Sequence, residues 1–249
     1  FVARYRRVKP DVALRFVDPE ADPGAMREQG VRIDGEIELR YRDRSERLKM
    51  LTEREFTNAL LRLSRTQTRV AAFLIGDGER RPDGNANADL GQFGALLAQQ
   101  GVRAMALALG AQASVPDNTD LLVIANPRVP LVGSVVQAVI DFIERGGNLL
   151  WLAEPGENAN LGALADALSV RVLPGLAVDG AGAALGIGDP SFVAVTTYPP
   201  HAVTRGFDLI TLLPQAAALG QLADPRWDVK PLLRTGAQSW TETGAMPKA

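Results

Sequence analysis

The stretch NTDLLVIANPRVPLVGSVVQAVIDFIERGGNLLWLAEPGEN, residues 118–158, decides the fold. Its runs 121–125 and 149–153 are short and continuously apolar, as is typical of parallel strands buried on both faces. Between them, apolar residues recur at three- and four-residue steps and predict one amphipathic helix. The helix would begin near Pro130 and end at Gly146-Gly147. The stretch therefore predicts a strand–helix–strand unit with a right-handed crossover.

Ligands of parallel α/β sheets collect at the carboxyl ends of the strands, so the residues after each run are the first site candidates. Asn126 and Pro127 follow the first run, and Glu154 follows the second. Glu154 and Glu157 could act as acid and base if their carboxylates met. Helix capping and loop solvation are the alternative interpretation, and the sequence does not decide between them.

The pattern of elements divides the chain into three parts. From residue 69 to about 225, apolar strands alternate with helical stripes and predict an α/β domain with a mainly parallel sheet. Residues 1–68 are a separate segment, with a helix end at 1–8, strands at 12–17, 33–41 and 47–51, and a short helix at 22–30. A capping box at 52–55 opens a further helix. The Gly/Ala-rich residues 175–191 are predicted to be a loop, and residues 226–249 a tail.

Composition excludes several classes of protein. The 249 residues include no cysteine, which removes disulfides, thiolate metal sites and cysteine nucleophiles. No apolar run approaches the roughly 20 residues that cross a bilayer. Because the chain begins with Phe1, we expect a segment of a longer protein, with membrane anchors outside it.

Charge is unevenly distributed along the chain. Residues 1–69 carry 16 Lys and Arg against 12 Asp and Glu, and the remainder carries 11 against 17. We interpret the basic part as a solvated face of mixed charge; a surface for a partner is the alternative. Nothing in this distribution indicates nucleic acid.

Gly76-Asp77-Gly78-Glu79 follows the first predicted strand of the α/β part, where chemistry is expected. It lacks the GxGxxG and GK[ST] patterns of phosphate-binding loops. Asp77 and Glu79, with Asp83 and Asp89, could ligate a hard cation. We interpret the segment instead as a solvated acidic loop, with a flexible stretch at 80–89, and we predict no metal and no cofactor.

His201 is the single histidine, and Trp240 lies in the predicted tail. A lone histidine cannot build a zinc site without carboxylates, and no GxSxG elbow supplies a serine for a triad. We interpret His201 as a turn residue whose ring nitrogens bond nearby backbone. Trp240, an aromatic in a polar tail, is a candidate contact with a domain surface or a partner.

Seven segments carry a resemblance that covers nearly the whole chain. They are residues 16–19 (FVDP), 53–65 (EREFTNALLRLSR), 73–79 (FLIGDGE), 121–127 (LLVIANP), 142–150 (FIERGGNLL), Tyr198 with 201–204 (HAVT), and 239–242 (SWTE). In this order they resemble the extracytoplasmic domain of the auxiliary component of gliding-motility-type ABC transport systems. The GHGE-like loop of that family is GDGE here, so Asp77 stands where a histidine is expected.

The resemblance implies a fold in three parts. Residues 1–68 would be a partial thioredoxin-like segment without a redox CxxC. Residues 69–225 would be a three-layer α/β sandwich with a flavodoxin-like sheet, similar to class I glutamine amidotransferases. Residues 226–249 would lead towards a membrane anchor. Without cysteine, amidotransferase chemistry of that kind is excluded, so the fold does not carry the function.

Three functional hypotheses follow from the resemblance and the residues. The first is a non-catalytic accessory domain of an ABC-type transport system on the periplasmic face of the inner membrane. Its partners would be the permease and associated subunits, and self-association is left open. The second is a hydrolase or sugar-processing enzyme that uses Asp77, Glu79, Glu154 or His201. The third is a small-molecule sensor that uses the same crevice.

Overall fold

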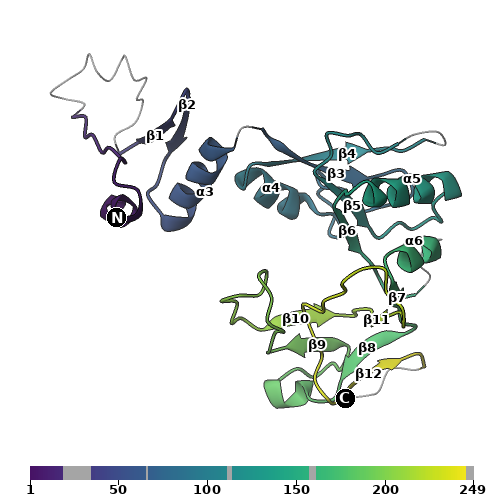
Figure 1. Cartoon of the computed structure of the whole chain (residues 1–249). Coiled ribbons are helices and arrows are strands. Elements are labelled where there is room, and N and C mark those ends of the chain that lie inside the picture. Colours follow the sequence, from purple (N-terminus) through teal and green to yellow (C-terminus); the bar gives the residue numbers. More distant parts are fainter. Residues whose placement is uncertain (19–34, 66, 111–113, 157–160, 245–249) are drawn as a thin grey trace. The chain divides into compact units, whose positions relative to one another are not determined.

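The computed structural model describes residues 1–18, 35–65, 67–110, 114–156 and 161–244. The chain divides into two compact units, Phe1–Gln67 and Thr68–Ala249 (Figure 1). Each unit has a core of its own, and each is described separately below.

The first unit is a β-hairpin with two helices. Strands β1 (Ile37–Tyr41) and β2 (Arg44–Leu48) pair antiparallel, and helices α1 (Val2–Val8) and α3 (Glu53–Ser64) accompany them. Leu48, Phe56 and Ala59 form the buried core, onto which Tyr5 packs. The hydroxyl of Thr52 accepts a hydrogen bond from the Glu55 backbone N–H at 3.2 Å, the predicted cap of α3.

One predicted strand of the first unit is wrong. Residues 12–17 are irregular, and Phe16 is 88% exposed. No described strand pairs with them, and an alternating pattern without a ladder partner does not make a strand. The helix predicted at 22–30 lies outside the described residues.

The second unit is built on a four-stranded parallel sheet, and its first element is β3 (Arg69–Leu74). The other strands are β4 (Val102–Leu107), β5 (Leu121–Ala125) and β6 (Leu149–Leu152), in the spatial order β4-β3-β5-β6. Helix α4 (Gly91–Gln99) connects β3 to β4, and α5 (Gly133–Glu144) connects β5 to β6. Both strands and the helix predicted within 118–158 are present.

A helix covers each face of this sheet. On one face, Leu122 and Ile124 of β5 pack against Val139 and its neighbours on α5. On the other face, Phe73 of β3 packs against Phe93 of α4, with ring centroids 6.4 Å apart. Burial on both faces explains why these strands are continuously apolar rather than alternating.

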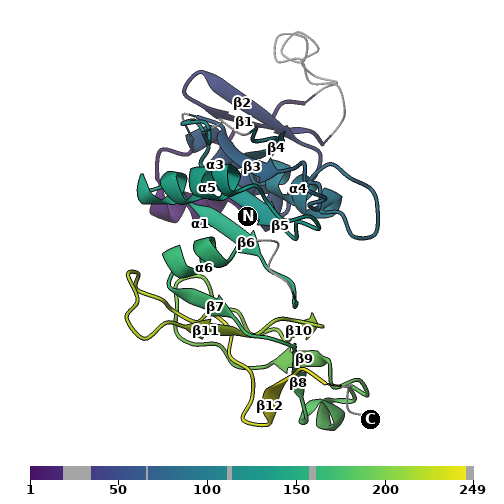
Figure 2. The ribbon, with the colours of Figure 1, turned by 90° about the vertical axis from the view of Figure 1, so that its right-hand side faces the viewer.

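Short antiparallel strands complete the second unit and gather apart from the parallel sheet (Figure 2). They follow helix α6 (Gly162–Ala167) and form three pairs. The pairs are β7 (Val170–Val172) with β11 (Leu219–Gln221), β8 (Leu176–Asp179) with β12 (Ser239–Glu242), and β9 (Phe192–Val195) with β10 (Thr211–Pro214).

The loop predicted at 175–191 is wrong in part, because β8 and the 3-10 helix η1 (Gly182–Leu185) lie within it. Val178 of β8 is fully buried and lies opposite Trp240 of β12. The partner strand is about 60 residues away in the sequence, so local periodicity does not reveal this pairing.

Residues beyond 225 are bound to the rest of the second unit. The Trp227 indole N–H donates to the carbonyl of Ala167 at 2.9 Å, and the Arg226 backbone N–H donates to the Ser169 hydroxyl at 2.8 Å. Strand β12 adds backbone pairing with β8. Up to residue 244 the predicted tail is therefore part of a folded unit. Within the described residues, no helix is long and apolar enough to span a membrane.

Candidate functional site

The order of the strands places the predicted site at the carboxyl ends of β3 and β5. From β3 the chain moves to β4 on one side, and β5 lies on the other side of β3. In open α/β sheets, ligands bind where the strand order changes direction in this way. The loops that begin at residues 75 and 126 meet at this point.

Backbone hydrogen bonds join these two loops. The N–H groups of Arg128 and Val129 donate to the carbonyl of Asp77 at 2.8 and 3.0 Å, and the N–H of Arg80 donates to Ala125 at 2.9 Å. A Cβ at Gly78 would lie 3.0 Å from the Cβ of Arg128, so the glycine permits the close approach. The two loops therefore form one bonded structure.

Glu79 is buried at this junction, with 6% of its surface exposed. Its Oε2 accepts the Asp77 backbone N–H at 2.8 Å, whereas its Oε1 is buried and has no partner among the described residues. Glu79 thus differs from the solvated loop residue that we predicted. An unpaired buried carboxylate oxygen is costly and is satisfied by a water or another donor.

Arg80 connects this junction to the end of β6, where its guanidinium pairs with the carboxylate of Glu154. Asn126 has a φ of +51° and donates its backbone N–H to the carbonyl of Leu152 at 3.3 Å. Four predicted candidates, Asp77, Glu79, Asn126 and Glu154, therefore lie on loops that hydrogen bonds connect. Among the described residues, no hydrogen bond or ion pair joins His201 to them.

The acidic residues that follow have partners within their own loop. Asp89 accepts the backbone N–H groups of Arg81 and Ala86, at 3.2 and 3.1 Å, and Asp83 pairs with the Arg81 guanidinium. The stretch 80–89, predicted to be flexible, is thus held by the Asp89 carboxylate. In the part of the chain that the structure describes, no group of three His, Asp or Glu is placed to hold a metal.

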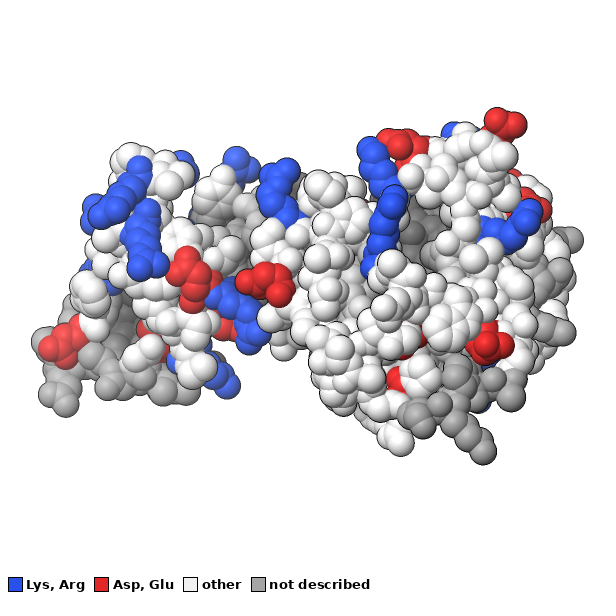
Figure 3. Space-filling model, turned by 90° about the horizontal axis from the view of Figure 1, so that it is seen from below, with Lys and Arg blue, Asp and Glu red and all other residues white. Residues whose placement is uncertain are grey.

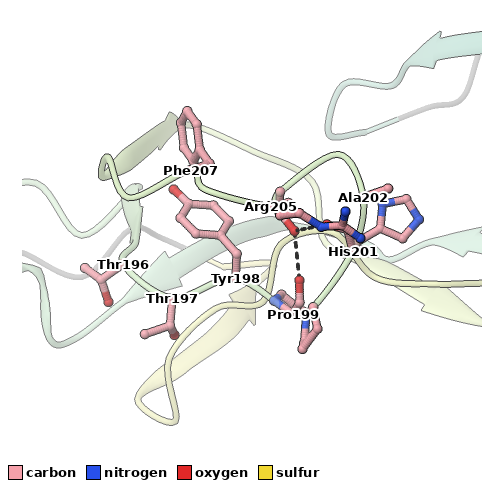
Figure 4. Close-up of a pocket in the computed structure, with 10 residues that line it drawn as sticks. Thr196, Thr197, Tyr198, Pro199, His201, Ala202, Arg205 and Phe207 are labelled. Atoms are coloured by element: carbon pink, nitrogen blue, oxygen red, sulfur yellow. Dashed lines mark hydrogen bonds between the residues drawn. The ribbon is translucent and has the colours of Figure 1, made fainter. Parts of the chain in front are cut away.

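His201 instead lines a separate hollow of about 710 Å³ on the loop after β9 (Figure 4). Its Nδ1 accepts the backbone N–H of Val203 at 3.2 Å, as expected for a turn histidine. Besides His201, the lining comprises Thr196, Thr197, Tyr198, Pro199, Pro200, Ala202, Thr204, Arg205 and Phe207.

Hydrogen bonds connect the walls of the hollow. The Tyr198 hydroxyl donates to the carbonyl of Leu209 at 2.7 Å and lies 2.7 Å from the Thr211 hydroxyl, which ties the loop to β10. The Thr204 hydroxyl donates to the carbonyl of Pro199 at 2.9 Å. These bonds join residues of the loop that lines the hollow to one another and to β10.

Sequence reasoning missed Arg205 and Phe207 as site residues. Phe207 packs edge-on against Tyr198, with ring centroids 5.1 Å apart, and Arg205 projects beside His201 in the view of Figure 4. The available signal was the spacing of an aromatic, a histidine and an arginine at 198, 201 and 205. These residues are three and four apart, as on one face of a helix, but Pro199-Pro200 between them argues against a helix, so the spacing gave no reason to group them.

Trp240, the predicted partner contact, is 45% exposed on β12. Its indole N–H donates to the carboxylate of Glu242 at 3.2 Å. The pKa of Glu242 is lowered, first by the Gly244 backbone N–H and next by this indole N–H. Trp240 is therefore tied to its own strand and keeps an exposed ring face.

The fold and the bonded strand-end loops define an α/β protein with a parallel sheet and appended antiparallel strands. A family model described as an ABC-type uncharacterized transport system matches residues 68–247, and the chain belongs to this family of auxiliary ABC transport components. The predicted resemblance is thereby confirmed at the level of the auxiliary component.

Solved structures support the fold alone. The N-terminal domain of mmIFT52 is similar with a TM-score of 0.51 and 14% sequence identity, over 68% of this chain and 79% of that one. At this identity the likeness carries no statement about activity. No curated protein matches this chain.

Proposed function

We propose that this chain is a non-catalytic, extracytoplasmic accessory domain of an ABC-type transport system that acts by binding other subunits of that system. The family match over residues 68–247 is the observation that carries the proposal. The permease and its associated subunits are the proposed partners.

The arrangement of the strand-end loops supports a non-catalytic role. Glu154 is paired with Arg80, and the Asp77 backbone is bound at both its carbonyl and its N–H. His201 bonds local backbone. A nucleophile needs a base within hydrogen-bonding reach, and among the described residues these groups form no such pair.

An exposed apolar segment at residues 203–212 supports binding of a protein. Val203 is 71% exposed, Leu209 66% and Ile210 59%, all in the loop before β10. On the face of the second unit in Figure 3, uncharged surface lies between scattered charged side chains. Exposed apolar side chains that gather on a surface mark interaction sites. Because the family is an auxiliary transport component, we propose that a transporter subunit binds these residues.

Co-purification from membranes tests this assignment with the full-length protein. We expect it to recover subunits of the transport system, and we expect the double variant Leu209→Glu/Ile210→Glu to lose them, because charge is costly in an apolar interface. Leu96→Glu is the matched control, since Leu96 is 54% exposed on α4. If the unchanged protein recovers no subunit, the proposal fails.

A hydrolase or sugar-processing enzyme is the alternative, and the unpaired Oε1 of Glu79 is the observation that favours it. In that case the strand-end loops would open so that a substrate hydroxyl reaches this oxygen, which is buried in the structure. The variants Glu79→Gln and Glu154→Gln decide the matter if a turnover is detected: unchanged turnover in both would remove the alternative.

The proposal also covers the cellular location of the chain and the detailed fold of its second unit. The family resemblance supports the periplasmic face and an anchor outside residues 1–249. The strand order β4-β3-β5-β6 supports a flavodoxin-like, three-layer assignment of the second unit, because it is the order 2-1-3-4 in chain sequence. The amidotransferase-like likeness and the thioredoxin-like origin of the first unit stay predictions.

A further inference from the structure

The hollow after β9 is lined by both polar and apolar residues and carries a single charge. Of its lining residues only Arg205 is charged at neutral pH, and none is acidic. Arg205 is exposed and makes no hydrogen bond or ion pair with any other described residue. A guanidinium with five donors and no carboxylate beside it is suited to an anionic ligand.

Further donors line the same hollow. Because Nδ1 of His201 accepts the Val203 N–H, Nε2 carries the proton of the neutral ring and is a donor. The hydroxyls of Thr196 and Thr197 form no hydrogen bond with another described residue. Their donors, like those of Arg205, are available to oxygen atoms of a ligand.

The other end of the hollow is apolar. The rings of Tyr198 and Phe207 meet edge to face at 84°. In the view of Figure 4 these rings lie away from Arg205 and His201, which share the opposite end. A ligand that fills the hollow therefore has an acceptor-rich end and an apolar or ring-shaped end.

We propose that this hollow binds a carboxylate joined to an apolar or ring-shaped body. Arg205 takes the carboxylate, and Tyr198 and Phe207 contact the body. The volume of about 710 Å³ falls within the roughly 300–1,000 Å³ of small-molecule sites. Two sources share this chemistry: a free carboxylic acid, and a peptide with a free carboxyl terminus beside an aromatic residue. The proposal does not rest on transporter association, although Thr204, Arg205 and Phe207 line the hollow and also lie within the segment 203–212.

Titration of the whole chain followed by backbone amide NMR tests it. The probes are 3-phenylpropionate, its neutral amide, and an acetylated dipeptide ending in phenylalanine with a free or an amidated carboxyl terminus. We expect the two carboxylate probes to shift the backbone N–H signals of residues 196–207. The two neutral amide probes should leave those signals unchanged. Stronger binding by the dipeptide than by 3-phenylpropionate would identify a peptide as the ligand, and the reverse a free acid.

Variants locate the binding. Arg205→Gln should weaken carboxylate binding about tenfold or more, the equivalent of losing a charge-assisted hydrogen bond. Thr197→Val should weaken it less, and Arg234→Gln, an exposed arginine outside the hollow, should leave it unchanged. Equal binding of the neutral amides, no shift at 196–207, or undiminished binding in Arg205→Gln would overturn the proposal.

Discussion

Glu79 is one of two described residues that have a buried side-chain oxygen without a hydrogen-bond partner. One carboxylate oxygen is bonded to the Asp77 N–H, and the other is buried and unpaired. Such a group is retained where it holds a loop or meets a further donor. Glu79 lies where the loops after β3 and β5 meet, so it could either hold these loops together or bind a further donor at the strand-end site.

Removing the Glu79 carboxylate tests whether its hydrogen bond to the Asp77 N–H stabilises the loop. Glu79→Ala leaves the Asp77 N–H without its acceptor and should lower the free energy of unfolding by about 1–3 kcal/mol. Glu79→Gln keeps an acceptor oxygen and should lose less. Denaturant unfolding followed by circular dichroism measures both, with Asp83→Ala in the same loop as a control that changes little. If Glu79→Ala is as stable as the parent, the loop does not depend on this bond.

Glu242 gives a prediction about pH. Its pKa is lowered by the Gly244 N–H and the Trp240 indole, so its ionised form stabilises the native state. That stabilisation is present above the ordinary pKa of a glutamate in the unfolded chain and is lost as the pH falls through the lower native pKa. In Trp240→Phe, carboxyl NMR should show a pKa raised above that of the parent and still below the ordinary value. An unchanged pKa would mean that the indole contributes nothing.

For single residues, the sequence predicted where the functional groups lie along the chain, but not which hydrogen bonds and ion pairs they form. Strand ends identified Asp77, Asn126 and Glu154, because the apolar runs before them are unambiguous. The burial of Glu79 and the pairing of Arg80 with Glu154 depend on loops that meet only in three dimensions. The hollow at Arg205 depends in the same way on the bond between Tyr198 and Leu209.

Among the elements, the pairing of β8 with β12 depends on one glycine. Gly175 has a φ of +85°, and a Cβ there would lie 2.3 Å from the carbonyl oxygen of Glu242. The strand therefore approaches β12 closely only because the side chain is absent. This contact holds the last described residues onto the second unit.

Gly175→Ala should consequently separate β12 from β8. Gly186→Ala is the matched control, because Gly186 has a φ of +77° and open space around its Cβ. Both variants carry the backbone strain of about 1–2 kcal/mol for a left-handed residue. Only Gly175→Ala should also lose hydrogen-exchange protection of the β12 amides. Equal protection in the two variants would show that the close approach is not required.

Elements with local signals were predictable, and elements with distant partners were not. The unit at 118–158 combines two apolar runs, one helical stripe and a glycine stop, and all three elements are present. The end of α5 also has its own cause, since a Cβ at Gly147 would lie 2.4 Å from the Phe142 ring. By contrast, β8 is hidden in a Gly/Ala-rich segment, and residues 12–17 have strand-like alternation without a partner.

The whole molecule consists of two units with separate cores. A unit with its own hydrophobic core can fold alone. We therefore expect a fragment of residues 68–249 to give a dispersed NMR spectrum that overlays with the corresponding signals of the whole chain. A fragment that is unfolded, or whose core signals shift throughout, would show that the first unit is needed to complete the second.

The family assignment joins these scales in one account: an α/β unit, strand-end groups bonded to one another, and exposed apolar side chains at 203–212 that we propose contact a transporter subunit. Site-directed photo-cross-linking in membranes tests that claim most directly. The full-length protein would carry the cross-linking residue in place of Leu209 or, as a control, in place of Leu96. We predict that the Leu209 position cross-links to a subunit of the transport system and that the Leu96 position does not. No cross-link at Leu209, or the same products at both positions, would contradict the account.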